Sequence, residues 1–203
     1  MIRFVLASSS PARQATLRTA GIEPQVVVSG VDEDAVLAAA IEERGKLTPA
    51  ESALLLARAK AEAVHDDGAL VLGCDSVLEL DGQAYGKPAN AAEAVDRWRA
   101  MRGRSGVLHT GHWLVDNRSG TGSRSTGDVA STTVHFADLS DEEIEAYVAT
   151  GEPLRVAGAF TIDGLGGPFV TGVEGDHHTV VGLSLPLLRG LLAEFGVRWH
   201  ELW

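Results

Sequence analysis

Short apolar runs and helix-start patterns alternate along the chain. Thr48 and Glu51 have the spacing of a capping box, with proline at the first helical position, which predicts a helix to about His65. The same reasoning applied to the rest of the chain predicts the other elements. Helices are expected at about 11–20, 35–43, 91–102, 141–150 and 186–195, and strands at 4–6, 25–28, 69–74, 77–80, 83–85, 106–116, 128–136, 156–162 and 169–174.

The first predicted helix carries a cation where the helix dipole disfavours one. Ser10 is suited to cap this helix and Pro11 to occupy its first position, and Arg13 follows in the first turn, where the dipole is positive. A bound anion would remove the mismatch, and the hydroxyls from Ser8 to Ser10 would add donors. Two interpretations stay open: a phosphate-binding turn, or a capped helix with a solvated arginine.

Carboxylates follow two of the predicted strands. Asp75 and Ser76 come directly after strand 69–74, and ligands bind at the carboxyl ends of strands in open α/β sheets. Asp75 is therefore a better catalytic candidate than a carboxylate on a helix surface. Glu33 lies in the acidic run 31–34 behind another strand. That run is either a solvated loop whose acids favour the next helix, or a site for a hard cation such as Mg²⁺.

Two lysines have surroundings that suit contact with an anion. Lys60 shares a helix face with Leu56 and Val64, so its ammonium group either turns toward solvent or reaches into a polar pocket. Lys87 stands between a glycine and a proline in a loop, where it suits contact with a phosphate. The alternative for Lys87 is an ordinary exposed loop lysine.

The histidines are expected to be structural. His109, His112 and His135 have no fixed metal-site spacing, so satisfied structural side chains are favoured. His177 and His178 are predicted to lie near a strand turn. Adjacent side chains of a strand face opposite ways, which disfavours chelation of one ion by this pair.

Composition narrows the choice of partners and compartment. The chain has 203 residues, of which 45% are hydrophobic, and no linker divides it, so we expect one domain spanning 1–203. A net charge of −11 without a basic run argues against nucleic-acid polymers and anionic membranes as partners. The single cysteine, Cys74, excludes an internal disulfide and is expected to be a small buried residue. No run approaches the ~18 apolar residues of a membrane span, so we expect a soluble, cytoplasmic protein.

A series of short motifs spans nearly the whole chain: Leu6–Arg13, Val31–Glu33, Ala57–Ala61, Gly73–Val77, Gly86–Pro88, Ser105–Gly106 with Thr110–Gly111, Ser131–Val134, Glu152–Pro153, Ala157–Gly158 and Val181–Leu183. Taken in order, these motifs resemble the Maf family of nucleoside triphosphate pyrophosphatases. The resemblance implies a two-lobed α/β fold with a mixed β-sheet, flanking helices and a central cleft, related to the inosine triphosphatases. It also implies a homodimer.

The implied reaction is hydrolysis of a nucleoside triphosphate between its α and β phosphates, which gives the monophosphate and pyrophosphate. By the resemblance Asp75 is the proton acceptor, and Glu33 acts with it. Both carboxylates suit a divalent cation, Mg²⁺ or Mn²⁺, which neutralises charge at the leaving pyrophosphate. The catalytic set is completed by Lys60 and Lys87. The positions that face the phosphates in the family correspond to these two lysines together with Ser8, Ser10 and Arg13.

Three positions that distinguish branches of the family match neither branch fully. They are Ala12, Ser76 and Asp163. The branch acting on dTTP and UTP has arginine, threonine and glutamine there, and the 7-methyl-GTP branch has tryptophan, glutamine and glutamate. Asp163 resembles the second branch in charge, whereas Ser76 resembles the first. The preferred base therefore stays open, with Asp163 either contacting a base or capping a strand end.

Two other functions remain alternatives. The family has also been called septum formation inhibitor, so the chain could be a non-catalytic nucleotide-binding regulator of cell division. A phosphatase that releases inorganic phosphate is the second alternative. The complete set Glu33, Asp75, Lys60 and Lys87 favours the pyrophosphatase, because a protein that only binds a nucleotide needs no activated water.

Overall fold

One mixed seven-stranded β-sheet forms the framework of the molecule in the computed structural model, which describes residues 2–118 and 122–203. The strand order is β2-β1-β3-β5-β6-β7, and β4 pairs with β3 outside this path. β1 is parallel to β2 and β3, and the remaining pairs are antiparallel. The strands are β1 Arg3–Leu6, β2 Gln25–Val26, β3 Ala69–Leu80, β4 Gln83–Tyr85, β5 Ser105–Asp116, β6 Arg124–Phe136 and β7 Val170–Glu174.

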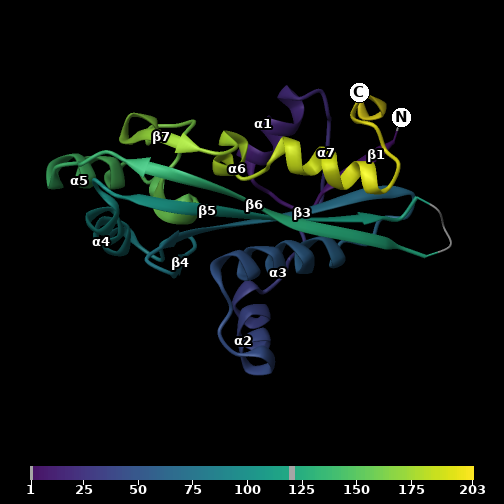
Figure 1. The fold of residues 1–203 in the computed structure, drawn as a ribbon, viewed down its shortest axis with the longest axis horizontal. Coiled ribbons are helices and arrows are strands. Elements are labelled where there is room, and N and C mark those ends of the chain that lie inside the picture. Colours follow the sequence, from purple (N-terminus) through teal and green to yellow (C-terminus); the bar gives the residue numbers. More distant parts are fainter. Residues whose placement is uncertain (1, 119–121) are drawn as a thin grey trace.

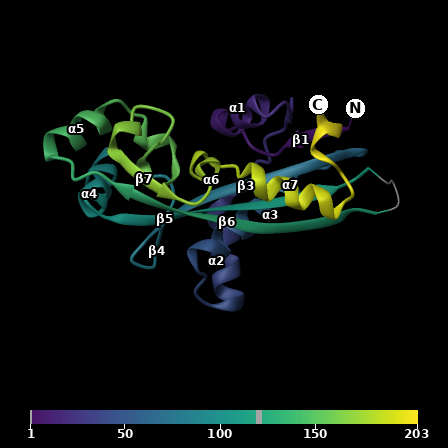
Figure 2. The same ribbon diagram turned by 45° about the horizontal axis from the view of Figure 1, so that its top comes forward.

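Helices cover both faces of this sheet. α2 and α3 lie on one face, and α1, α6 and α7 lie on the other (Figures 1 and 2). The predicted α/β fold with a mixed sheet and flanking helices is thus confirmed. In the described part of the chain the α-helices are α1 Pro11–Thr19, α2 Glu33–Arg44, α3 Pro49–Glu62, α4 Ala91–Met101, α5 Asp141–Ala149, α6 His177–Val181 and α7 Leu185–Glu194, and the 3₁₀ turns are η1 Pro153–Arg155, η2 Ala157–Ala159, η3 Gly167–Phe169 and η4 Trp199–Leu202.

α3 approaches the sheet unusually closely because two strand residues have no side chain. A Cβ atom on Gly73 of β3 would lie 2.1 Å from the carbonyl oxygen of Ala57, and one on Gly111 of β5 would lie 2.4 Å from that of Ala53. The helix face toward the sheet is built from alanines, of which Ala53 and Ala57 are fully buried. Small residues on both surfaces therefore bring the α3 backbone next to β3.

A separate aromatic core holds α4 and α5 at one end of the sheet. Trp98 is fully buried and packs edge-on against Phe136, Tyr147 and Phe169, with ring centroids 5.6–6.0 Å apart. Its indole N–H donates to the carbonyl oxygen of Ala159 at 2.8 Å. The ring packing and this hydrogen bond together fix α4 in place.

The strand predicted at 156–162 is wrong. The segment forms the 3₁₀ turn η2 instead, in which Gly158 and Ala159 have φ angles of 71° and 60°. Ala159 and Phe160 are buried, so the apolar run reflects burial in the aromatic core. Because a short apolar run has the same composition in a strand and in a buried turn, the pattern could not separate them.

Smaller departures concern element ends. Strand β2 ends at Val26, and α2 begins at Glu33, two residues before the predicted start. The helix predicted at 186–195 ends at Glu194, and Phe195 lies just beyond it and is partly buried. The segment between the strands predicted at 106–116 and 128–136 is shorter than expected because β6 begins at Arg124, and residues 119–121 lie outside the described part of the chain. No described helix is both long and apolar enough to cross a membrane.

Candidate active site

Strand β3 lacks a neighbour along one edge, and the candidate residues gather there. β1 pairs with β3 over Ala69–Leu72 and β4 pairs with it over Leu78–Leu80, so residues 73–77 have a strand partner only in β5. Asp75 was expected at the end of a strand but lies in the middle of β3. The apolar run ends at Cys74, but the strand continues because its pairing with β5 extends to Glu79.

Asp75 forms an ion-paired cluster on the α3 face of the sheet. The Nζ atom of Lys60 lies 2.5 Å from Oδ1 of Asp75 and 2.8 Å from Oε1 of Glu33. The side chains of Lys60 and Asp75 are 11% and 12% exposed, and that of Glu33 is 48% exposed. Of the two interpretations for Lys60, the polar one is correct. Its ammonium group reaches Asp75 because α3 lies so close to β3.

Burial raises the pKa of Asp75 above its ordinary value, and the charge of Glu33 acts in the same direction. The charges of Lys60 and Arg13 oppose this shift and lower the pKa. The carboxylate therefore has an increased affinity for a proton while a bound ammonium group still favours its charged form. A carboxylate with a raised pKa that still has a charged form is suited to accept a proton.

Arg13 is buried on the opposite face of the sheet, so the solvated-arginine interpretation is wrong. Its Nε atom donates to the carbonyl oxygen of Gly182 at 2.7 Å, and Nη1 donates to that of Cys74 at 2.9 Å. Nη1 also donates to Oγ of Ser8 at 3.0 Å, and Nη2 donates to Oγ of Ser76 at 3.2 Å. The guanidinium thus satisfies a carbonyl on the open edge of β3 and joins α1 to the segment after α6.

The turn between β1 and α1 is ordered by its own hydroxyls. Oγ of Ser10 accepts from the amide of Arg13 at 3.4 Å and caps α1, as predicted. Oγ of Ser8 accepts from the amide of Ser10 at 3.3 Å. Ala12 follows the cap and is partly exposed. Four of the sequence-predicted binding residues, Ser8, Ser10, Arg13 and Ser76, are therefore linked by hydrogen bonds.

Lys87 and Asp163 stand apart from this network. Both side chains are exposed, and no described residue forms a hydrogen bond or an ion pair with either. Their loops are nevertheless connected, since the amide of Gly158 donates to the carbonyl oxygen of Gly86 at 3.1 Å. Both residues are thus free to meet a ligand, on loops whose backbones are held together.

Glu152 holds the loop that carries Asp163, a role the sequence did not predict. Its carboxylate accepts hydrogen bonds from the hydroxyl of Tyr147 at 2.9 Å and that of Thr161 at 2.6 Å. Backbone amides of the loop donate to the same group, from Leu165 at 3.0 Å and Gly166 at 3.1 Å. The sequence marked Glu152–Pro153 as one of the motifs of the resemblance, but nothing in that pair indicated which groups the carboxylate would bind.

Cys74 and His112 are chemically inactive here, as expected. Burial raises the pKa of the Cys74 thiol to about 12, so it carries no thiolate at neutral pH. Burial lowers the pKa of His112 to about 4. Nε2 of its neutral ring accepts from the amide of Ser184 at 2.8 Å, and Nδ1 lies 3.0 Å from the carbonyl oxygen of Thr110.

The placement of His177 and His178 differs from the prediction. Both lie on α6 rather than beside a strand turn, and their rings stack with centroids 3.8 Å apart. Asp176 caps this helix and lies 2.9 Å from Nδ1 of His178. Among the described residues these three place ligand atoms within 4.8 Å of one another. The oxygen atoms of Asp176 are, however, already engaged by the helix.

A family model described as Maf-like protein matches residues 3–195. The chain belongs to the Maf family. A relative in Salinispora tropica is 60% identical, with 100% of this chain and 88% of the relative covered. Another in Streptomyces coelicolor is 58% identical, with 99% and 94% covered, and both are named nucleoside triphosphate pyrophosphatase. The structure of a HAM1 protein from Coxiella burnetii aligns at 24% identity with a TM-score of 0.37, covering 68% of this chain and 75% of that one.

In this Maf-family chain, Glu33 and Asp75 fit the requirements of a hard divalent cation. Oε1 of Glu33 and Oδ1 of Asp75 contact Lys60, and the other oxygen of each carboxylate has no partner among the described residues. Because both paired oxygens contact the same Nζ atom, the two carboxylates lie close together. Carboxylate oxygens completed by phosphate oxygens and water are the ligands that Mg²⁺ and Mn²⁺ favour.

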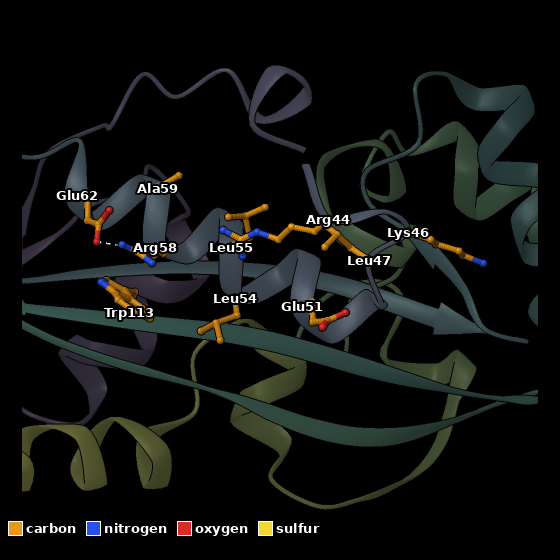
Figure 3. A pocket seen from close by; sticks show the side chains of 10 residues that line it. All are labelled: Arg44, Lys46, Leu47, Glu51, Leu54, Leu55, Arg58, Ala59, Glu62 and Trp113. Atoms are coloured by element: carbon orange, nitrogen blue, oxygen red, sulfur yellow. Dashed lines mark hydrogen bonds and ion pairs between the residues drawn. The ribbon is translucent and has the colours of Figure 1, made fainter. Parts of the chain in front are cut away.

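Two pockets of this Maf-family chain lie away from the candidate residues. One of about 460 Å³ is lined by the α2 end, by α3 and by Trp113, whose ring is covered by the guanidinium of Arg58 (Figure 3). The other, of about 310 Å³, lies beside Trp199 near the end of the chain. Neither includes Asp75 or its partners.

Proposed function

We propose that this Maf-family protein is a pyrophosphatase that hydrolyses a nucleoside or deoxynucleoside triphosphate, with a standard or a modified base, to the monophosphate and pyrophosphate. The observation that carries the proposal is the cluster in which Lys60 joins Asp75 and Glu33 at the open edge of β3. Relatives at 50–60% identity that bear the name of this activity support it.

Asp75 is the proposed proton acceptor. Its carboxylate takes a proton from a water molecule whose oxygen forms a bond to the α-phosphorus. The bond between that phosphorus and the α–β bridging oxygen breaks, and its electron pair leaves with pyrophosphate. Lys60 keeps Asp75 in its charged form despite burial, because the ammonium charge lowers the pKa of the carboxyl group.

Glu33 and Asp75 are the residues that would hold a divalent cation, Mg²⁺ or Mn²⁺. Such an ion, when bound, neutralises charge on the phosphate oxygens. Among the phosphate-facing candidates, Lys87 is the exposed cation without a protein partner and is proposed to contact the phosphates directly. Arg13 already donates to four protein oxygen atoms. Its charge is therefore proposed to attract the phosphates without direct contact, with Ser8 and Ser10 between the guanidinium and the substrate.

The base is proposed to be selected by Ala12, Ser76 and Asp163. Ser76 is held by Arg13 and by Thr110, whose hydroxyl lies 2.9 Å from its own, so its position is fixed. Asp163 is exposed and presents an acceptor on the loop that Glu152 holds. An exposed carboxylate can accept from a base N–H or pair with a cationic methylated base.

Hydrolysis in ¹⁸O-labelled water tests this proposal. The protein is incubated with Mg²⁺ and a panel of triphosphates, and the products are identified by mass spectrometry. The pyrophosphatase predicts pyrophosphate, with the label on the monophosphate because water attacks the α-phosphorus. Release of orthophosphate would instead support the phosphatase. Tight nucleotide binding without turnover would support the non-catalytic regulator.

A further inference from the structure

The loop that carries Lys87 is held by α4 on both sides of the lysine. The carbonyl oxygen of Gly86 accepts from Nη1 of Arg97 at 2.5 Å, and the amide of Ala89 donates to Oε2 of Glu93 at 2.8 Å. Lys87 itself is exposed, and no described residue pairs with its side chain. The backbone around the lysine is therefore fixed, while its ammonium group remains free for a ligand.

One buried guanidinium makes most of these contacts. The Arg97 side chain is only 4% exposed, and its Nη2 atom lies 2.6 Å from Oε1 of Glu93. Its carbon Cζ lies 5.0 Å from the ring centroid of Tyr85, the last residue of β4. Arg97 thus contacts Tyr85 and Gly86, which precede Lys87. Through Glu93 it is also linked to Ala89, two residues after the lysine.

Burying this arginine is unfavourable in itself. Burial lowers the pKa of Arg97, although the negative charge of Glu93 raises it. The Nε atom of Arg97 is also buried and has no hydrogen-bond partner among the described residues. An apolar side chain of similar size would avoid both costs. The position of α4 does not require Arg97, because the neighbouring Trp98 already anchors the helix in the aromatic core. The contacts of Arg97 serve the loop rather than the helix.

We propose that Arg97 is a positioning residue that places the Lys87 ammonium group for contact with the phosphates of the substrate. It acts through Gly86, whose carbonyl oxygen also accepts from the amide of Gly158 on the segment leading to Asp163. The inference rests on the proposed function, because Lys87 needs accurate placement only if it contacts a substrate. A loss of placement of about 1 Å can cost about a hundredfold in rate.

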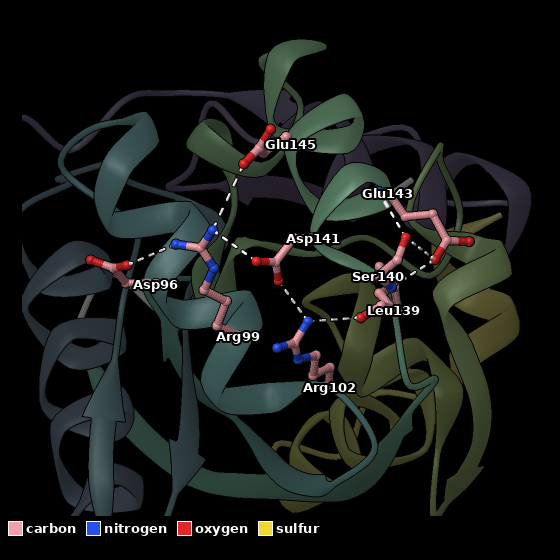
Figure 4. Close-up of polar contacts among 8 residues, drawn as sticks. All are labelled: Asp96, Arg99, Arg102, Leu139, Ser140, Asp141, Glu143 and Glu145. Carbon is pink, nitrogen blue, oxygen red and sulfur yellow. Dashed lines mark hydrogen bonds and ion pairs between the residues drawn. The ribbon is translucent and has the colours of Figure 1, made fainter.

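The first test compares two arginines of the same helix. Arg97→Met removes the contact to Gly86 and is expected to lower kcat by about tenfold or more, with a smaller change in KM. Arg97→Lys keeps a donor and should restore part of the loss. The control is Arg99→Met. Arg99 also forms ion pairs, but its partners are Asp96 and residues of α5, away from the loop, so activity should stay within about twofold of wild type (Figure 4).

A double-mutant cycle decides whether Arg97 acts through Lys87. Lys87→Ala should lower kcat, and Arg97→Met should then cause little further loss in that background. Losses that multiply would overturn the proposal, because Arg97 would be acting elsewhere. A wild-type kcat in either single variant would also overturn it. If Arg97→Met fails to fold, Glu93→Gln replaces it in the same cycle. This substitution weakens the hydrogen bond from the amide of Ala89 and leaves the buried Arg97 side chain in place.

Hydrogen exchange separates this proposal from the proposed activity. In Arg97→Met, the backbone amides of Ala89 and Gly158, which are hydrogen-bonded to Glu93 and Gly86, should exchange faster than in wild type, while those of α3 and β3 should not change. Unchanged exchange at Ala89 and Gly158 would contradict positioning by Arg97 even in an active enzyme. If the wild-type protein hydrolysed no triphosphate, the proposed function would fail, whereas the exchange result would still report on the loop.

Discussion

Nζ of Lys60 lies 2.5 Å from Oδ1 of Asp75, on a helix and a strand that meet through small residues. The contact depends on Gly73, two residues before Asp75 on the same face of β3, because any side chain there would enter the α3 backbone. The spacing between helix and strand therefore determines whether the ammonium group reaches the carboxylate.

Gly73→Ala is expected to damage stability and activity together. A Cβ atom 2.1 Å from the carbonyl oxygen of Ala57 must push α3 away from β3, at a cost of about 1–3 kcal/mol or more. Thermal unfolding and kcat measure the two effects. Gly190→Ala on the exposed side of α7 is the matched control, since nothing lies within 4 Å of its added Cβ, and it should stabilise the helix by about 0.5–1 kcal/mol. An unaltered melting temperature in Gly73→Ala would show that α3 packs less closely than described.

Lys60→Met is expected to move the acidic limb of the pH–rate profile to higher pH. The ammonium charge lowers the pKa of Asp75 while burial raises it, so its removal leaves burial less opposed. Because a general base acts in its charged form, kcat/KM should then reach its plateau only at a higher pH. A profile with an unchanged acidic limb would mean that another group is the base.

The same substitution has a consequence for stability. The folded-state pKa of Asp75 lies above its ordinary value, so protonation favours the folded protein. The associated contribution to stability is fully present below the ordinary pKa and is lost as the pH rises through the raised pKa. In Lys60→Met this loss should occur at a higher pH, which unfolding in denaturant across an acidic pH series measures.

Asp163→Gln is expected to change the ranking of bases more than the rate on the best substrate. The exposed carboxylate has no described partner, so its replacement should leave the fold unchanged while it removes a charge from the proposed base site. Initial rates across the triphosphate panel give the ranking. Asp96→Asn, on the surface of α4, serves as the control for a lost surface charge. If the ranking is the same in both variants, Asp163 is structural.

The sequence indicated several of the residues that lie together at the candidate site, but not the elements that bring them together. Asp75 was selected by its polar character after an apolar run, although the strand continues through it because β5 pairs along its whole length. For Lys60 the sequence left two orientations open. Only the close packing of α3, which depends on glycines in two strands distant along the chain, determines which one occurs.

Residues that act through the backbone were not predictable. Arg97 belongs to no motif, and the Glu152–Pro153 motif does not by itself imply a hydrogen bond to another loop. Arg13 attracted attention because a cation at a helix start is unfavourable. Its compensation proved to be carbonyl and hydroxyl acceptors of the protein itself, which come from three separate segments.

The turnover of Asp75→Asn is the most direct test of the central claim. Asparagine keeps the shape of the side chain but cannot accept the proton, so kcat should fall by about 10²–10⁴-fold while the circular dichroism spectrum stays that of the wild type. The assay is pyrophosphate release with Mg²⁺ from the best substrate of the panel. A rate near that of the wild-type enzyme in a folded Asp75→Asn variant would contradict the assignment of Asp75 as the base.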